Sequence, residues 1–176
     1  PCECLDFVEI AHRDRVYPCM QCRMRLAGEL SVGRMRDAVA LLAAVVPELL
    51  YSVDFRRCCF VDRGMQASDA VVECEGEIGD RPLRDLDEAP QLRVFVCRRS
   101  GRTDLLVVLS HVLSDGAGFL QCLYLLARAY NTGFLDPGLS NCRDVGFLLE
   151  GAAASSPTEA ERRSSKAPSA PVRPVA

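Results

Sequence analysis

The sequence predicts an α/β domain, an α+β sandwich in which a mixed, largely antiparallel sheet carries helices packed on one side. Three observations support this fold class. Strand-like runs at 92–98 and 103–110 flank a Ser-Gly-Arg turn, which is a hairpin signal. Apolar residues recur at helical spacing over 32–46 and again over 117–130. Further strand-like runs lie between these elements.

The first part of the chain predicts a short helix at 5–12 and a strand at 20–30. Ser31 is a suitable N-cap for the next helix, and Pro47 stops that helix or bends its last turn. One face of the helix is apolar and is expected to pack in the core. Its members are Val32, Met35, Ala38, Val39, Leu42, Val45 and Val46.

The middle of the chain predicts strands at 52–61 and 70–75, then a polar loop at 76–90. Residues 105–109 are all apolar, as is typical of a central strand buried on both faces. The last helix ends at Gly133. The residues expected on its packed side are Phe119, Leu120, Leu123, Leu126, Ala127 and Tyr130.

Composition predicts a single cytoplasmic domain. The 176 residues are 49% hydrophobic and 26% charged, which provides enough apolar material for one core. We expect residues 1–150 to form one lobe and residues 151–176, mostly Ala, Ser and Pro, to be a disordered tail. Acids and bases are interleaved at a net charge of −3, which disfavours nucleic-acid binding. We expect neither a membrane span nor a signal peptide.

Ten cysteines raise the question of a metal or redox site. The best metal spacing is that of two pairs, Cys2 with Cys4 and Cys19 with Cys22. However, Cys19 and Cys22 fall in a predicted strand, where residues three apart face opposite sides. Reduced core cysteines and no bound metal are therefore the favoured interpretation. A redox or metal protein is the less favoured alternative.

His111 is the only candidate catalytic base. The other histidine, His12, lies among charged residues, and nothing nearby marks it as functional. His111 ends the apolar strand and comes before a helix, and an imidazole takes up and returns a proton near neutral pH. Asp115 can fix the turn or cap that helix, while Gly116 and Gly118 permit a tight backbone. A histidine at a strand end is also commonly just a satisfied polar residue, and an Asp-Gly pair just a turn.

The segment from Ser110 to Gly116 resembles the His-x-x-x-Asp-Gly motif of one acyltransferase superfamily. Its members include chloramphenicol acetyltransferase, alcohol acetyltransferases, plant acyltransferases and peptide-synthetase condensation domains. The context is similar too, because an apolar strand precedes the motif and an amphipathic helix follows it. The resemblance covers roughly residues 5–135. It is strongest over 90–133, which looks most like the N-terminal lobe of bacterial alcohol-acetyltransferase-like proteins.

This resemblance implies an acyltransferase. His111 would be the general base that deprotonates a small alcohol or amine as it attacks an acyl thioester on coenzyme A or a carrier protein. Acyl-CoA would be a co-substrate, and no permanently bound cofactor is expected. Asp115 would be structural and hold the loop through an ion pair with an arginine. Gly116 would give the loop room.

Two departures from the family pattern lie in and near the motif. Ser110 stands in the first position of the doubled-histidine form of the motif. Tyr51 and Val53 stand where relatives often have arginines, one of which pairs with the residue equivalent to Asp115. Another arginine would then have to replace it. The candidates are Arg25, Arg56 and Arg57.

The third departure is length. By the resemblance, full enzymes place the histidine in a tunnel between two similar lobes, whereas this sequence predicts one lobe. A homo-oligomer or a separate second lobe would complete the site. Two hypotheses stay open: an acyl-CoA-dependent acyltransferase, or a catalytically degenerate half-domain that acts as a partner-binding or structural module. An uncovered apolar face around 120–126 would favour self-association.

Overall fold

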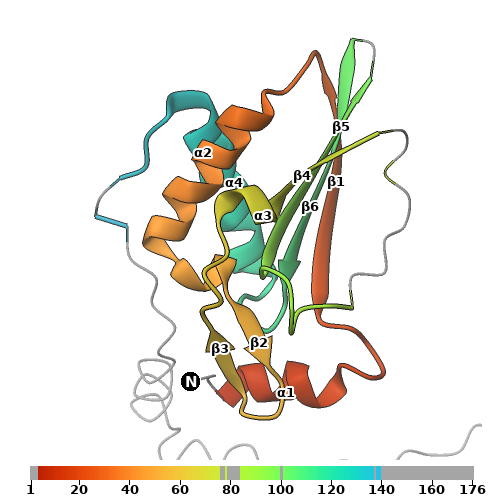
Figure 1. Cartoon of the computed structure of the whole chain (residues 1–176), viewed down its shortest axis with the longest axis vertical. Helices are drawn as coiled ribbons and strands as arrows, with labels where there is room; N and C mark the ends of the chain where they lie inside the picture. Colours follow the sequence, from red (N-terminus) through yellow and green to blue (C-terminus); the bar gives the residue numbers. More distant parts are fainter. Residues whose placement is uncertain (1–3, 76–77, 79–83, 100, 137, 140–176) are drawn as a thin grey trace, which may run out of the picture. The chain divides into compact units, whose positions relative to one another are not determined.

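The computed structural model describes residues 4–75, 78, 84–99, 101–136 and 138–139. The expected boundary at residue 150, the expected tail at 151–176 and residues 76–77 and 79–83 of the expected loop lie outside them. Within them, two long helices cover one face of a four-stranded sheet with strand order β1-β6-β5-β4 (Figure 1). The predicted fold class is therefore confirmed. The elements are β1 (Cys19–Ala27), α2 (Val32–Val45), β4 (Val71–Cys74), β5 (Leu92–Arg99), β6 (Arg102–Ser110) and α4 (Gly116–Thr132).

The sheet is mixed and largely antiparallel. Strand β6 pairs antiparallel with both β1 and β5, and β5 pairs parallel with β4. The predicted hairpin is confirmed, and Gly101 in its turn has a φ of 74°, which residues with a Cβ rarely adopt. The prediction for 105–109 is also confirmed, because β6 is central and none of these residues is more than 4% exposed.

Helix α2 begins where the sequence predicts. The Ser31 hydroxyl caps it by accepting a hydrogen bond from the Arg34 amide, and Pro47 opens a short 3₁₀ helix, η1 (Pro47–Leu50). The predicted apolar face is buried at Val32, Met35, Ala38, Val39 and Leu42. Burial of this stripe against the sheet, rather than helix propensity alone, stabilises such a segment.

Helix α4 packs through most, but not all, of the predicted stripe, since Leu123 and Tyr130 also pack against the core cluster. Phe119, Leu126 and Ala129 are buried, whereas Leu120 is 52% exposed and Ala127 is also exposed. The prediction that Leu120 and Ala127 lie on the packed side is therefore wrong. Apolar residues occupy two neighbouring stripes of this helix, and periodicity alone does not select which stripe meets the sheet. Gly133, at a φ of 66°, ends the helix as predicted.

The single strand predicted at 52–61 is wrong. The chain instead forms a hairpin of β2 (Ser52–Asp54) and β3 (Cys59–Val61). The Asp54 carboxylate accepts hydrogen bonds from the amides of Arg56 (2.9 Å) and Arg57 (3.0 Å), and these bonds reverse the chain. Helix α1 (Cys4–His12) matches its prediction, and a short helix, α3 (Ala67–Ala70), precedes β4.

The two sheet faces carry separate apolar clusters. Cys22 lies on the face covered by the helices, and Cys19 lies on the opposite face with Phe95 and Val108. The prediction that Cys19 and Cys22 face opposite sides is confirmed, so the two thiols cannot share one ion. Within the described residues, no group of three His, Cys, Asp or Glu side chains is placed to hold a metal.

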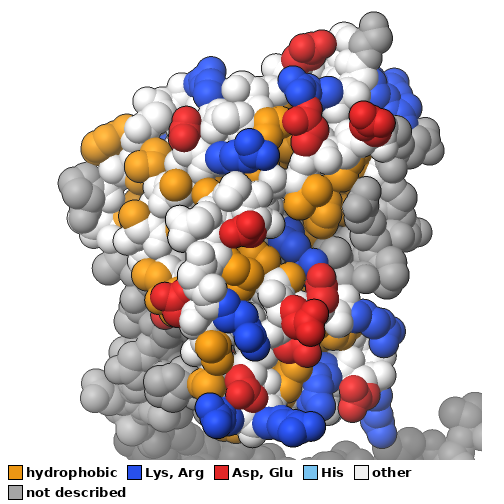
Figure 2. All heavy atoms as spheres, viewed as in Figure 1, with side chains coloured by type: hydrophobic (Ala, Val, Ile, Leu, Met, Phe, Trp, Pro, Cys, Tyr) orange, Lys and Arg blue, Asp and Glu red, His pale blue; other side chains and the backbone are white. Residues whose placement is uncertain are grey.

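The surface carries mixed charge. In the view of Figure 2, acidic and basic side chains alternate across the molecule with hydrophobic side chains between them, rather than gathering by sign. No helix of the described part of the chain is both long and apolar enough to cross a membrane.

Replacing Leu92, which is fully buried in β5, tests the core. We expect Leu92→Ala to lower the free energy of unfolding by about 2–5 kcal/mol, because it removes packed methyl groups and leaves a cavity. Leu120→Ala is the matched control and should change it by less than about 0.5 kcal/mol, since Leu120 is 52% exposed. Urea unfolding measures both values, and equal losses would contradict the assigned packing of these two leucines.

Candidate functional site

The backbone at the end of β6 fixes the position of His111. The Ser110 amide donates to the Gln91 carbonyl (2.9 Å), and the His111 amide donates to the Pro18 carbonyl (2.8 Å). The sheet therefore holds the start of the motif on both sides, through the segments that lead into β5 and β1. A base held by a rigid element keeps its geometry better than one on a free loop.

The turn after β6 is closed by Ser110. This serine is fully buried, its hydroxyl accepts from the Val112 amide (3.2 Å), and its carbonyl accepts from the Leu113 amide (3.2 Å). Val112 is also fully buried, in a small cluster with Ile10 and Val53. His111 thus lies between two anchored neighbours, and its side chain stays 39% exposed. Ser110 acts here as a turn-forming residue.

Gln91, just before β5, stabilises this end of the sheet through buried hydrogen bonds. Its side chain is 1% exposed, and Nε2 donates to the carbonyls of Tyr51 and Leu86, each at 3.1 Å. Its own carbonyl is the acceptor for Ser110. One buried amide therefore ties the 3₁₀ helix, the segment before β5 and the motif together. Sequence reasoning missed Gln91, because a polar residue before a strand has no distinguishing pattern.

Asp115 caps helix α4. Its Oδ1 accepts a hydrogen bond from the Gly118 amide at 2.8 Å, which satisfies one of the free amides at the helix N-terminus. The expected ion pair with an arginine does not form with any arginine that the structure describes. Arg25 is bound to Asp104 (3.0 Å), and the turn around Asp54 holds Arg56 and Arg57.

A side chain would be obstructed at Gly118, just after the motif, rather than at Gly116. A Cβ on Gly118 would lie 2.2 Å from the Ser114 hydroxyl oxygen, so that side chain would have to move. A Cβ on Gly116 would meet no atom within 4 Å, and this glycine has no positive φ. The family resemblance predicts that Gly116 is needed to give the loop room. In this structure the space beside Gly116 is open, so a larger side chain would fit there.

Glu9 is the acidic side chain that meets His111. Its Oε1 lies 3.7 Å from His111 Nδ1, and the Glu9 side chain is 33% exposed. Sequence reasoning missed this contact, because α1 and the motif lie far apart in the chain. The other histidine, His12, is exposed, and its Nδ1 lies 2.8 Å from the Val8 carbonyl oxygen on its own helix.

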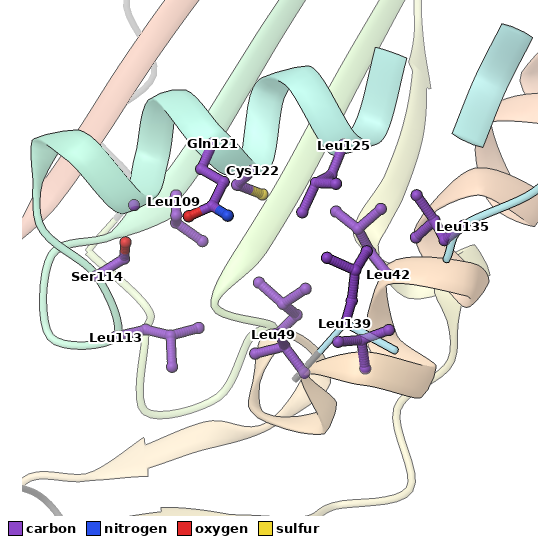
Figure 3. Close-up of a pocket in the computed structure, with 13 residues that line it drawn as sticks. Leu42, Leu49, Leu109, Leu113, Ser114, Gln121, Cys122, Leu125, Leu135 and Leu139 are labelled. Atoms are coloured by element: carbon purple, nitrogen blue, oxygen red, sulfur yellow. The ribbon is translucent and has the colours of Figure 1, made fainter. Parts of the chain in front are cut away.

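An apolar cavity of about 140 Å³ lies on the helix side of the motif loop. Leucines from α2, η1, β6 and α4 line it, and Ser114 and Gln121 are the polar members of the lining (Figure 3). Gly118 also contributes to its wall, so the motif loop forms one side of the cavity. His111 itself is not part of the lining.

Two partly buried cysteines, Cys19 and Cys122, are poorly suited to redox or metal chemistry. Burial raises the pKa of Cys122, which lines the cavity, to about 11. Burial also raises the pKa of Cys19 to about 11, against a smaller lowering by the Arg93 charge. Both thiols are therefore protonated at neutral pH, whereas nucleophilic attack and metal binding need the thiolate.

The chain is similar in fold to solved condensation and cyclization domains. The chain is similar to the cyclization-docking bidomain of the EpoB peptide synthetase from Sorangium cellulosum, with a TM-score of 0.60 and 16% identity over 94% of this chain and 37% of that one. It is also similar to the condensation domain of the monacolin K polyketide synthase MokA, with a TM-score of 0.59 and 12% identity over 88% and 39% of the two chains. A third is the starter condensation domain of the rhizomide synthetase, with a TM-score of 0.56 and 10% identity over 88% and 43%.

These likenesses define the class of fold. The chain has the fold of a condensation-domain lobe, which confirms the resemblance read from the motif at the level of the superfamily fold. The chain spans less than half the length of each of these structures. No protein-family model matches the sequence, and a search of curated proteins finds no similar sequence.

Substitutions at Asp115 separate a capping role from an ion-pair role. We expect Asp115→Ala to lower the free energy of unfolding by about 0.5–2 kcal/mol through loss of the cap. Asp115→Asn should stay within a few tenths of wild type, because its side-chain oxygen still accepts from the Gly118 amide. Thermal or urea unfolding measures both. An Asn variant as unstable as the Ala variant would show that the charge, not the cap, stabilises the loop.

Proposed function

We propose that this protein transfers an acyl group from a thioester, with acyl-CoA as the donor, to a small alcohol or amine. The observation that carries the proposal is the placement of His111. Its half-exposed imidazole is fixed at the end of a central strand by backbone hydrogen bonds on both sides. The condensation-domain fold supports acyl transfer or condensation as the class of reaction.

In the proposed reaction, His111 accepts the proton of the acceptor hydroxyl or amine as its oxygen or nitrogen attacks the thioester carbonyl. The new bond forms as the carbonyl π electrons move to oxygen. When that oxygen reforms the carbonyl, the carbon–sulfur bond breaks. The imidazolium then returns the proton to the departing thiolate, so the base is regenerated and no metal is required. General base catalysis of this kind contributes about 10²–10⁴ in rate.

We further propose that the apolar cavity beside the motif loop accepts the acyl group. Its volume of about 140 Å³ suits a short chain, since an apolar cavity of ~150 Å³ holds a molecule the size of benzene. Ser114 of the motif and Gly118 in the first turn of α4 form part of its wall, so the cavity lies next to the loop that follows His111. The second wall of the reaction site must come from outside the described residues, from another copy of this chain or a separate lobe.

Replacing each histidine in turn tests the proposed activity. We expect His111→Ala to lower the turnover of acetyl-CoA with a panel of alcohols and amines by about 10²–10⁴. His12→Ala should leave turnover unchanged, because that ring is exposed and lies against a backbone carbonyl of its own helix. Mass spectrometry of the acylated product is the measurement. Product formed equally well by wild type and His111→Ala would rule out the assigned base.

A second candidate function is a non-catalytic half-domain that binds a partner. The exposed apolar side chains favour it. Leu120 (52% exposed), Tyr124 (69%) and Phe134 (54%) lie on or just after α4. Apolar side chains that gather on one surface commonly mark an interaction site. In this case the motif loop would be retained for its structural role at the end of the sheet.

Charge substitution on α4 tests whether the partner in this second candidate is another copy of this chain. We expect wild-type chain to associate at micromolar concentration, and Leu120→Glu with Tyr124→Glu to be monomeric, because both changes place charge on exposed apolar positions. Sedimentation velocity measures the difference. Arg128→Glu, on an exposed position of the same helix, is the control for charge alone. A wild-type monomer would contradict self-association through this face.

A further inference from the structure

We propose that Glu9 is a positioning residue for His111: its carboxylate holds the imidazole in the tautomer that carries the proton on Nδ1. The proposal starts from the approach of the two side chains, with Glu9 Oε1 at 3.7 Å from His111 Nδ1. The consequence for turnover rests on the proposed function, but the effect on the ring does not.

Helix α1 is anchored to the same turn that carries His111. Ile10, the residue after Glu9, is 4% exposed and packs with Val53 and Val112, which are fully buried. Val112 in turn follows His111. The carboxylate and the imidazole are thus each one residue from a shared apolar cluster. Their approach is set by packing and not only by the flexibility of two surface side chains.

The C-terminal end of α1 is held by further contacts. The Arg13 Nη1 group donates to the Ile10 carbonyl (2.8 Å), and its guanidinium lies over the Phe55 ring at 5.1 Å from the centroid. Phe55 packs against the same cluster as Ile10. The helix end therefore contacts the β2–β3 hairpin as well as the motif turn, which restricts movement of Glu9 away from His111.

A carboxylate at Nδ1 has a defined chemical effect on an imidazole. It favours the neutral ring with the proton on Nδ1, which leaves the Nε2 lone pair free to accept a proton from another group. It also stabilises the imidazolium formed by that proton transfer, through opposite charge. The 3.7 Å separation is longer than a hydrogen bond and within ion-pair range, and such contacts often tighten only when substrate binds.

The tautomer of His111 can be read by long-range ¹H–¹⁵N NMR on the full chain at a pH where the ring is neutral. The chain has two histidines, so a His12→Asn variant assigns both signals. We expect wild type to show mainly the Nδ1–H form. Glu9→Gln should retain it, because the amide oxygen still accepts. Glu9→Ala should shift the ring toward the Nε2–H form. Asp37→Ala, an exposed carboxylate on α2, is the control.

Turnover provides the second readout. We expect Glu9→Ala to lower kcat by about tenfold or more with little change in KM, and Glu9→Gln to restore part of the loss. Circular dichroism and the unfolding midpoint check that Glu9→Ala is folded. An unchanged His111 tautomer in folded Glu9→Ala would overturn the positioning role. A tautomer shift in a protein without His111-dependent turnover would instead uphold the pairing and overturn the proposed acyl transfer.

Discussion

The burial of β6 between β1 and β5 is the constraint on which the rest of the structure depends. Its residues alternate between the helix-side cluster and the opposite cluster, so both cores need this strand in one register. A shift by one residue would exchange Val107 and Leu109 with Leu106 and Val108, and it would move Asp104 into the helix-side core. Because the register is fixed, the end of β6 at Ser110 is fixed too, and this sets the position of His111, the next residue.

Buried polar side chains at the end of the sheet bind the irregular segments beside it, although Gln91 Oε1 and Arg93 Nη2 have no hydrogen-bond partner within the described residues. The buried Gln91 amide binds two carbonyls, and the Arg93 guanidinium, with its side chain 7% exposed, pairs with Asp85 at 2.7 Å. Removing the partners of the Gln91 amide nitrogen or of the buried Arg93 charge would be costly. The irregular segments around residues 51 and 86 are therefore bonded to the strands. The motif turn packs beside these ordered segments.

The sequence predicts those elements that are determined by residues close together in the chain. Helix α2, the β5–β6 hairpin and the central strand follow from periodicity, a cap and a glycine turn, all read within about fifteen residues. The β2–β3 turn depends on one aspartate that binds two backbone amides, and an apolar run with that aspartate inside resembles a single strand. The packed side of α4 depends on which of two apolar stripes meets the sheet, which is a tertiary choice. Likewise His111 and Asp115 are visible as a motif, whereas Glu9 and Gln91 join the site only through contacts distant in sequence.

The position of the His111 ring and the exclusion of water from it would have separate physical origins. The backbone bonds from Ser110 and His111, the cluster around Val112 and the contact with Glu9 all lie within the described lobe, and together they hold the imidazole. The described residues of this lobe do not exclude water, since 39% of the His111 side chain is exposed. Electrostatic effects on a reacting thioester grow as water leaves the site. A lobe of this kind can therefore keep its motif geometry whether or not it catalyses a reaction. Catalysis would depend on a further surface that covers His111 and excludes water.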